Sequence, residues 1–242
     1  MVKLLSLNVK GSNSPIKRKL ILTELKKQHA DIALLQETHH ANDEVWRLRD
    51  RNYPYYFYAS NRKKKAGVAI LFNKTSTFQL RRKEVDPNGR YIILEGTLEG
   101  VQIVIANLYA PNVRQIHFLQ KVLNKVASYQ NQKVILGGDF NMALSQLRDT
   151  MRPHSTLPNK EATLCSQNFR KLIRKALLLD IWRIKHPTQK QYTFYSHPHK
   201  TFSRIDYFLI SPKLKIGPQI NSDHDLIHID IRIPDLPSRQ WT

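Results

Sequence analysis

Apolar residues occur along the chain in short runs, separated by polar segments that contain glycine or proline. Runs without helical periodicity are typical of strands, which are short and rich in branched and aromatic residues. The expected strands are Lys3–Asn8, Ile32–Gln36, Gly67–Phe72, Tyr91–Leu98, Val101–Leu108, Lys133–Leu136, Tyr192–Tyr195, Arg204–Ile210 and Leu226–Ile233. Asn88-Gly89 and Glu99-Gly100 supply turn residues, which predicts an antiparallel meander between Tyr55 and Leu108.

Helical spacing of apolar residues is found in segments that lie singly between groups of strands. Pro15 suits the first turn of one helix, whose apolar stripe contains Ile21, Leu22 and Leu25. The other expected helices are Gln115–Gln130 and Glu161–Lys175. This arrangement favours packed sheets with outer helices over a doubly wound sheet. We expect one domain over residues 1–233, followed by a tail or linker at 234–242.

The chain is strongly basic, which changes the picture from an ordinary globular domain to one with a polyanionic partner. It contains 39 lysines and arginines but only 19 acidic residues, so the formal net charge is +20. Nucleic acid is favoured over a membrane surface, because no apolar stretch is long enough to span and no long helix is basic on one face. Basic clusters that could follow a nucleic-acid backbone are Lys17-Arg18-Lys19, Arg62 to Lys65, Arg81-Arg82-Lys83, Arg170-Lys171 and Arg174-Lys175.

Cysteine and histidine usage limits the kinds of metal site. Cys165 is the only cysteine, which excludes an internal disulfide and any multi-cysteine zinc site, and a buried position is expected for it. The ten histidines do not form an HExxH pair or comparable spacing. A hard cation bound by oxygen atoms remains open.

Polar side chains follow the ends of several expected strands. They are Asn8, Glu37, Asp139, Asn141, Asp206, Asp223 and His224. If these ends converge, they form an acidic pocket in a basic protein, and a phosphate could enter only beside a cation such as Mg²⁺. An aspartate can then deprotonate water, and amides can donate to phosphoryl oxygens. Taken singly, each residue has an ordinary alternative as a turn former or surface charge.

Six short motifs occur in the order found in a known superfamily. They are Ser6-Leu7-Asn8-Val9, Gln36-Glu37-Thr38, Asn107-Leu108-Tyr109-Ala110-Pro111, Gly138-Asp139-Phe140-Asn141, Ser203-Arg204-Ile205-Asp206 and Ser222-Asp223-His224. The chain therefore resembles the endonuclease-exonuclease-phosphatase superfamily, with DNase I-like and AP endonuclease-like members. The resemblance implies a four-layered α/β sandwich of two mixed, largely antiparallel β-sheets flanked by helices.

Looser motifs resemble the endonuclease domain of LINE-type, non-LTR retrotransposons. They are Leu7 to Gly11, Lys65 to Leu71 and Tyr192 to Ser196. This resemblance implies a domain fused to a reverse transcriptase, acting in the nucleus on double-stranded DNA, without a membrane partner and monomeric in isolation.

The resemblance also implies roles for single residues. Glu37 would be the principal ligand of Mg²⁺, for which Mn²⁺ can substitute, with Asn8 and Asp223 close to the metal or the scissile phosphate. Asp139 would position or deprotonate the attacking water. His224 competes for that role, because its ordinary pKa of about 6.5 suits a base, and the sequence leaves both open.

Further positions would act on the phosphate. Asn141 would donate to a phosphate oxygen, Tyr109 would line the leaving-group side, and His224 with Asp206 would stabilise charge. Thr193 and Ser222 would be supporting hydrogen-bond donors. The segment from Ser211 to Asn221 is shorter than the loop and strand pair usual in the family before the motif that contains Asp223 and His224.

In relatives, a β-hairpin between the positions of Thr193 and Asp206 enters the minor groove. Its tip here would be Ser196 to Thr201, where deformable DNA could be selected by shape. The residues expected to contact DNA are Ser196, His197, His199, Lys200, Thr201 and Arg204. An ordinary solvated loop is the alternative.

Together these features predict a Mg²⁺-dependent DNA endonuclease that nicks one strand. The resemblance implies that the nick leaves a 3′-hydroxyl, which primes reverse transcription. Two alternatives remain open: an abasic-site repair endonuclease of the same superfamily, and a DNA-binding module without catalysis. The positive charge argues against lipid phosphatases of the superfamily.

Overall fold

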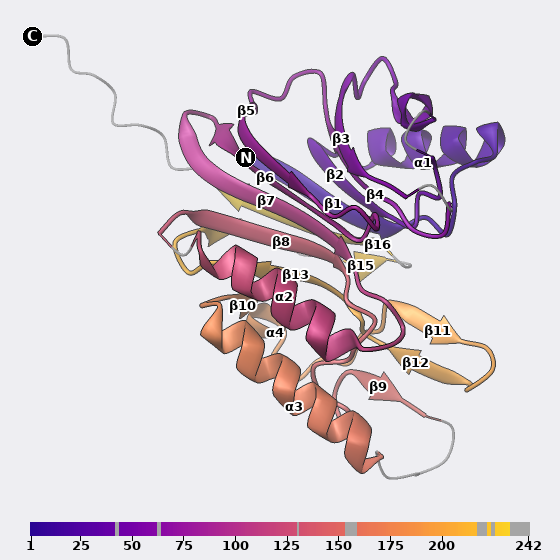
Figure 1. The fold of residues 1–242 in the computed structure, drawn as a ribbon, viewed down its shortest axis with the longest axis vertical. Helices are drawn as coiled ribbons and strands as arrows, with labels where there is room; N and C mark the ends of the chain where they lie inside the picture. The colour runs from indigo at the N-terminus through magenta and orange to yellow at the C-terminus, as the bar shows by residue number, and fades with distance from the viewer. Residues whose placement is uncertain are drawn as a thin grey trace, which may run out of the picture.

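The computed structural model describes residues 1–41, 44–61, 64–129, 131–152, 159–216, 222–223 and 226–232. Within these residues, two large β-sheets face each other and helices cover their outer faces (Figure 1). The expected α/β sandwich of two mixed sheets flanked by helices is therefore confirmed. The expected tail at 234–242 lies outside the described residues.

The first sheet has the order β14-β16-β1-β2-β4-β3, and β15 pairs with β16 beside this path. Its strands β1 and β2 run parallel, and its other pairings are antiparallel. The strand bounds are β1 Val2–Asn8, β2 Ile32–Gln36, β3 Tyr55–Ala59, β4 Val68–Phe72, β14 Lys215–Ile216, β15 Ser222–Asp223 and β16 Leu226–Arg232.

The second sheet has the order β10-β13-β8-β7-β6-β5, with β7 and β8 parallel. Its bounds are β5 Gln79–Val85, β6 Tyr91–Leu98, β7 Val101–Tyr109, β8 Lys133–Asp139, β10 Leu179–Asp180 and β13 Asp206–Ile210. A small third sheet joins β11 Phe194–Ser196, β12 Thr201–Ser203 and β9 Thr150–Met151. Strands β11 and β12 form the hairpin expected between Thr193 and Asp206.

The helices are α1 Pro15–Lys27, the short 3-10 helix η1 Val45–Leu48, α2 Gln115–Ala127, α3 Lys160–Lys175 and α4 Ile181–Lys185. Helix α1 buries Ile21 and Leu25 of its predicted stripe. No helix in the described part of the chain is long and apolar enough to span a membrane.

Three apolar clusters define the layers. The central cluster lies between the sheets and joins side chains such as Leu34 of β2 and Ile105 of β7. A second cluster packs α2 and α3 on the outer face of the second sheet, and a third packs α1 on the outer face of the first. The order of layers is therefore helix, sheet, sheet, helix, as Figure 1 shows.

Some expected features differ from the structure. The segment between Tyr55 and Leu108 is not one meander, because β3 and β4 join the first sheet while β5, β6 and β7 form a meander in the second. Strand β5 was not predicted, since its residues are mostly exposed and polar, as is usual at a sheet edge. Cys165 is partly buried rather than fully buried and packs against the second cluster.

Candidate active site

The ends of strands from both sheets place the predicted site residues together. Asn8 ends β1, and the next strand β2 leads directly into Glu37. In the second sheet, Asp139 at the end of β8 is paired with Tyr109 of β7 on one side and with Asp206 of β13 on the other. The predicted convergence of these strand ends is therefore present.

Asn8 joins the two carboxylates of this edge. Its Nδ2 donates to Glu37 Oε1 at 2.7 Å and to Asp139 Oδ2 at 2.9 Å. Its Oδ1 accepts from the backbone N–H of Lys10 at 3.0 Å, which fixes the orientation of the amide. Asn8 therefore bridges the two facing sheets at the centre of the site.

Asp139 is held in a buried position. Its Oδ1 accepts from the backbone N–H of Asn141 at 2.8 Å. Burial raises the pKa of Asp139 to about 6, and the carboxylate of Glu37 acts in the same direction. The hydrogen bonds from Asn8 and from the Asn141 backbone oppose this rise because they stabilise the charged form. A carboxylate with such a pKa is a suitable base near neutral pH.

Tyr109, at the end of β7 in the second sheet, lies beside Glu37, which follows β2 of the first sheet. Burial and the neighbouring Glu37 carboxylate raise the pKa of Tyr109 to about 12, so its hydroxyl stays protonated. The guanidinium of Arg90 lies over the Tyr109 ring at 4.5 Å from its centroid. Tyr109 can therefore donate a hydrogen bond toward an anionic group at the site.

Asn141 is fixed by the loop that follows β8. Its Nδ2 donates to the carbonyl of Ala110 at 2.7 Å, and its own carbonyl accepts from Gln115 Nε2 at 2.7 Å. Its predicted donation to a phosphate oxygen would use the second hydrogen of the same amide.

Several residues at or beside the site have a left-handed backbone conformation. Lys10, Glu37, His39 and Asn141 all have positive φ angles, between 44° and 59°. Such angles are uncommon for residues with a side chain, and they persist where surrounding contacts hold the backbone. Here they direct Glu37 and Asn141 away from the regular course of their strands.

A buried amide network behind the site was not assigned from the sequence. Gln36 Nε2 donates to Asn107 Oδ1 at 2.8 Å and to Ser6 Oγ at 3.0 Å, which links the two sheets. Asn107 Nδ2 in turn donates to the carbonyls of Leu35 and Ala69. The sequence signal for this network was an amide side chain in each of two apolar strand runs, Gln36 and Asn107, because buried amides need hydrogen-bond partners.

Thr193 and Asp206 lie at the base of the hairpin. The Thr193 hydroxyl oxygen accepts from the backbone N–H groups of Ile205 at 3.1 Å and Asp206 at 3.2 Å. Thr193 thus fixes the start of β13 as an acceptor, and its predicted role as a donor stays a prediction because the hydroxyl hydrogen is not used in these two bonds. Asp206 is buried, as expected for a residue that positions another group.

The last motif is only partly described. Ser222 and Asp223 form β15, paired with Ile227 and Leu226 of β16, so their backbone lies on the side of β16 opposite β1. Their side chains and the whole of His224 lie outside the described part, as do residues 217–221 of the short connection. The predicted roles of Ser222, Asp223 and His224 stay predictions.

The hairpin residues divide into two groups. Ser196 and Thr201 face each other at the ends of β11 and β12, and His197, His199 and Lys200 lie in the exposed turn between them. Lys10 connects the site to this hairpin, since its ammonium lies 5.6 Å from the ring centroid of Phe194 in β11. Contact of the turn with DNA stays a prediction.

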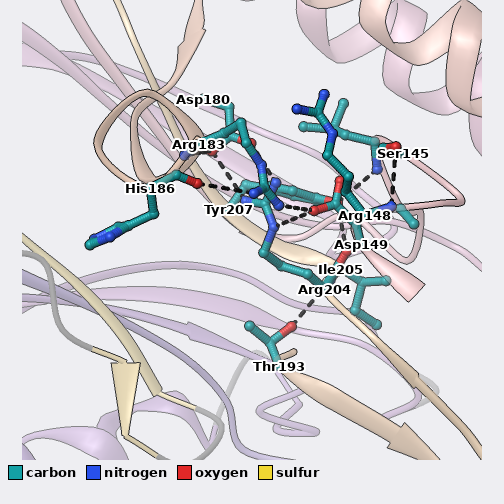
Figure 2. A network of polar contacts seen from close by, with 12 residues as sticks. Ser145, Arg148, Asp149, Asp180, Arg183, His186, Thr193, Arg204, Ile205 and Tyr207 are labelled. Atoms are coloured by element: carbon teal, nitrogen blue, oxygen red, sulfur yellow. Dashed lines mark hydrogen bonds and ion pairs between the residues drawn. The ribbon is translucent and has the colours of Figure 1, made fainter. Parts of the chain in front are cut away.

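Arg204 requires a correction. Its side chain is buried, and its guanidinium binds Asp149 at 2.9 Å and Asp180 at 2.6 Å (Figure 2). The nearby carboxylates and their hydrogen bonds raise the pKa of Arg204 despite its burial. Because these partners occupy the guanidinium inside the protein, Arg204 does not fit the predicted contact with DNA. It anchors the base of the hairpin instead.

The donor set suits a hard divalent cation in part. Glu37 and Asp139 offer carboxylate oxygens that both accept a hydrogen bond from Asn8 Nδ2. The negative charge of Glu37 raises the pKa of Asp139, and both carboxylates raise the pKa of Tyr109. Oxygen donors of this kind are those that Mg²⁺ prefers. In the described residues, no three or more histidine, cysteine, aspartate or glutamate side chains are grouped to hold a metal ion.

The chain is similar to several known nucleases. It is 29% identical over 235 residues to an exodeoxyribonuclease of Bacillus subtilis (strain 168), covering 88% of this chain and 90% of the relative. It is 26% identical over 178 residues to DNA-(apurinic or apyrimidinic site) endonuclease 2 of Schizosaccharomyces pombe (strain 972 / ATCC 24843), covering 61% of this chain and 33% of that protein.

Solved structures share the fold. The Xenopus laevis APE2 catalytic domain superposes with a TM-score of 0.73 at 19% identity, covering 95% of this chain and 91% of that one. AP endonuclease LMAP from Leishmania major gives a TM-score of 0.72 at 16% identity, with 96% and 88% covered. Residues 5–224 match the profile described as the Endonuclease/Exonuclease/phosphatase family, and the chain belongs to this family.

Proposed function

We propose that this chain is a Mg²⁺-dependent DNA endonuclease that nicks one strand of a duplex by phosphodiester hydrolysis. The observation that carries the proposal is the bridge from Asn8 to both Glu37 and Asp139 at the edge where the two sheets meet. The net charge of +20 supports a nucleic-acid substrate, and the names of the related nucleases point the same way.

In this mechanism, Glu37 would hold Mg²⁺ with Asn8 and Asp223 nearby, and Mn²⁺ could take its place. The bound cation would offset phosphate charge and polarise the phosphorus for attack. Asp139, with its raised pKa, would orient a water molecule and accept its proton. His224 remains the other candidate for this base.

Two neutral donors would face the phosphate. Tyr109 stays protonated near neutral pH and would donate to the phosphate or leaving oxygen. The amide of Asn141, held by Ala110, would donate to another phosphoryl oxygen. Asp206 would keep His224 in one orientation.

We further propose that the chain is a retrotransposon endonuclease of the LINE type. Its motifs from Leu7 to Gly11, Lys65 to Leu71 and Tyr192 to Ser196 support this class. The nick would leave a 3′-hydroxyl that primes reverse transcription, by a reverse transcriptase fused to the same protein. The enzyme would act in the nucleus on double-stranded DNA, with the hairpin turn in the minor groove and the isolated domain monomeric.

Abasic-site repair is the second candidate function, because two of the similar proteins are named as AP endonucleases. Matched duplexes with and without one abasic site distinguish the two. The proposal predicts comparable cleavage of the intact duplex, and a polymerase should extend the nicked strand without prior end processing. Cleavage confined to the abasic duplex, or ends that block extension, would overturn the retrotransposon assignment.

A further inference from the structure

A cavity of about 150 Å³ lies beside the buried ion cluster at the base of the hairpin. Its lining comes from the loop after Asn141, from α3 and from the β10–α4 corner. Five arginines but only two aspartates line it: Arg148, Arg170, Arg174, Arg183, Arg204, Asp149 and Asp180. The lining is therefore strongly positive.

The inner wall of this cavity is fixed by ion pairs (Figure 2). Asp149 binds Arg183 at 2.6 Å and Arg204 at 2.9 Å, and Asp180 also binds Arg204. Arg183 additionally donates to the carbonyls of His186 and Gln189, at 3.0 and 2.8 Å. Both aspartates are thus neutralised within the wall, and a ligand would meet groups that are already ordered.

The outer wall carries positive charge that no carboxylate in the described part of the chain offsets. Arg170 donates to the carbonyl of Leu144, and Arg148 to the carbonyl of Pro187 at 3.5 Å, which are neutral acceptors. Arg174 is exposed, and no acceptor within the described residues binds its guanidinium. These three guanidiniums present planar donors of the kind that bind phosphate.

The cavity is close to the active site along the chain. Ser145 in its lining follows Asn141 by four positions, so these Cα atoms are at most about 14 Å apart. A DNA strand rises by about 3.4 Å per phosphate along the helix axis, so this distance corresponds to at most roughly four nucleotides. The same loop continues into β9, which pairs with the hairpin strand β12.

We propose that this arginine cavity is a second phosphate-binding site, which holds a backbone phosphodiester of the DNA a few nucleotides from the nick. This inference rests on the proposed action on DNA, but it concerns binding and not the chemical step. Arg148 and Arg174 are its testable members, because both are exposed and neither belongs to the ion-paired wall.

The first test measures how duplex binding depends on salt, in chelator so that no cleavage occurs. The variants are Arg174→Ala and Arg148→Ala/Arg174→Ala, and the control is Lys171→Ala, an exposed cation of the same helix outside the cavity. One lost phosphate contact lowers the steepness of the slope of log affinity against log salt by about 0.9. The loss of affinity between 50 and 200 mM salt should then be about three- to fourfold smaller than in the wild type. An equal change in the control would overturn the proposal.

The second test locates the phosphate. Duplexes with one neutral methylphosphonate at successive positions are bound to the wild type and to the double variant. One position near the nick should weaken wild-type binding and leave the double variant unaffected. The DNA assignment would be overturned by two observations together. Wild-type binding would be insensitive to the substitution at every position outside the active site, and millimolar inorganic phosphate would compete with binding to the wild type but not to the double variant. These results would show a site for free anions.

These results are separable from the proposed function. If the wild type binds DNA with the expected phosphate position but does not nick plasmid in Mg²⁺, the cavity stands and the nuclease proposal fails. If nicking requires Glu37 but the variants at Arg148 and Arg174 match the Lys171 control, the nuclease proposal stands and the cavity proposal fails.

Discussion

Asn8 uses one side-chain nitrogen to hold two carboxylates that would otherwise repel each other. Its hydrogen bond lowers the pKa of Asp139 against the larger effect of burial. Asn8→Ala should therefore raise the pKa of Asp139 and move the acidic limb of the pH–rate profile to higher pH. We expect a fall in kcat of about 100-fold or more, as for loss of a preorganised donor.

The matched control is Asn13→Ala, an exposed amide in the loop after the same strand. Its profile should coincide with that of the wild type. An unchanged acidic limb in Asn8→Ala would mean that Asp139 is not the group whose ionisation limits the rate.

His40 gives a prediction on stability. The Ser12 hydroxyl donates to the Thr38 carbonyl, so it accepts from His40 Nε2 at 2.9 Å, and His40 Nδ1 has no hydrogen-bond partner among the described residues. Burial, reinforced by Arg18, lowers the pKa of His40 to about 4. The unfolded chain takes up this proton near pH 6.5 and the folded chain only near pH 4, so the free energy of unfolding should fall as pH decreases between these values.

The fall should be on the order of 2 kcal/mol after allowance for solvent screening. Urea unfolding over this pH range measures it in the wild type, in His40→Gln and in the exposed control His117→Gln. The dependence should shrink only in His40→Gln, and an equal slope in all three proteins would contradict the assignment.

At the scale of residues, the sequence could locate Asn8, Glu37 and Asp139 because each follows an apolar strand run. It could not show that Arg204 is buried, because its partners Asp149 and Asp180 are distant in the chain and only the fold brings them together. The same applies to the Gln36–Asn107 amide bridge between the sheets.

The element β8 depends on a close approach at Gly138. This residue has φ of +135°, and a Cβ there would lie 2.0 Å from the Leu108 carbonyl oxygen of the neighbouring strand β7. Gly138→Ala should lower the free energy of unfolding by about 3 kcal/mol or more, since it combines backbone strain with overlap of backbone atoms.

Gly100→Ala is the matched control, because Gly100 has φ of +72° in the exposed turn between β6 and β7. It should cost about 1 kcal/mol from conformation alone. Equal losses in the two variants, measured by urea unfolding, would show that the approach to Leu108 is unimportant.

The hairpin β11–β12 gives a prediction on selectivity. Replacing His197–Lys200 with Asn-Gly shortens the turn and keeps the strand pairing. If the turn reads groove shape, nicking of plasmid should persist while the distribution of nick positions on an end-labelled duplex changes.

The control Thr188→Ala/Lys190→Ala changes two exposed residues that lie outside the hairpin. It should retain the wild-type distribution. A shortened hairpin that cuts at the same positions as the wild type would remove the hairpin from site selection.

At the scale of elements, periodicity located α1, α2, α3 and the buried strands, because each has an apolar face. Strand β5 escaped because its residues are almost all exposed, and α4, at five residues, is too short for a helical pattern to be recognised. The hairpin was expected from the resemblance and not from apolar spacing.

For the whole molecule, the sequence indicated packed sheets but not which strands share a sheet. Strands β4 and β5 are neighbours in the chain and belong to different sheets, and this division is fixed by long-range pairing. Its consequence is functional, because Asn8 and Glu37 come from one sheet and Asp139 and Tyr109 from the other. The site exists only when both sheets pack.

The most direct test of this account is nicking of supercoiled plasmid by the wild type, by Glu37→Ala and by the control Glu161→Ala, an exposed glutamate at the start of α3. Circular dichroism checks that all three are folded. In Mg²⁺ the wild type and the control should convert the plasmid to the open circle, Glu37→Ala should be slower by about 100-fold or more, and chelator should stop all three. Equal nicking by Glu37→Ala, or nicking that persists in chelator, would contradict the proposed metal-dependent active site.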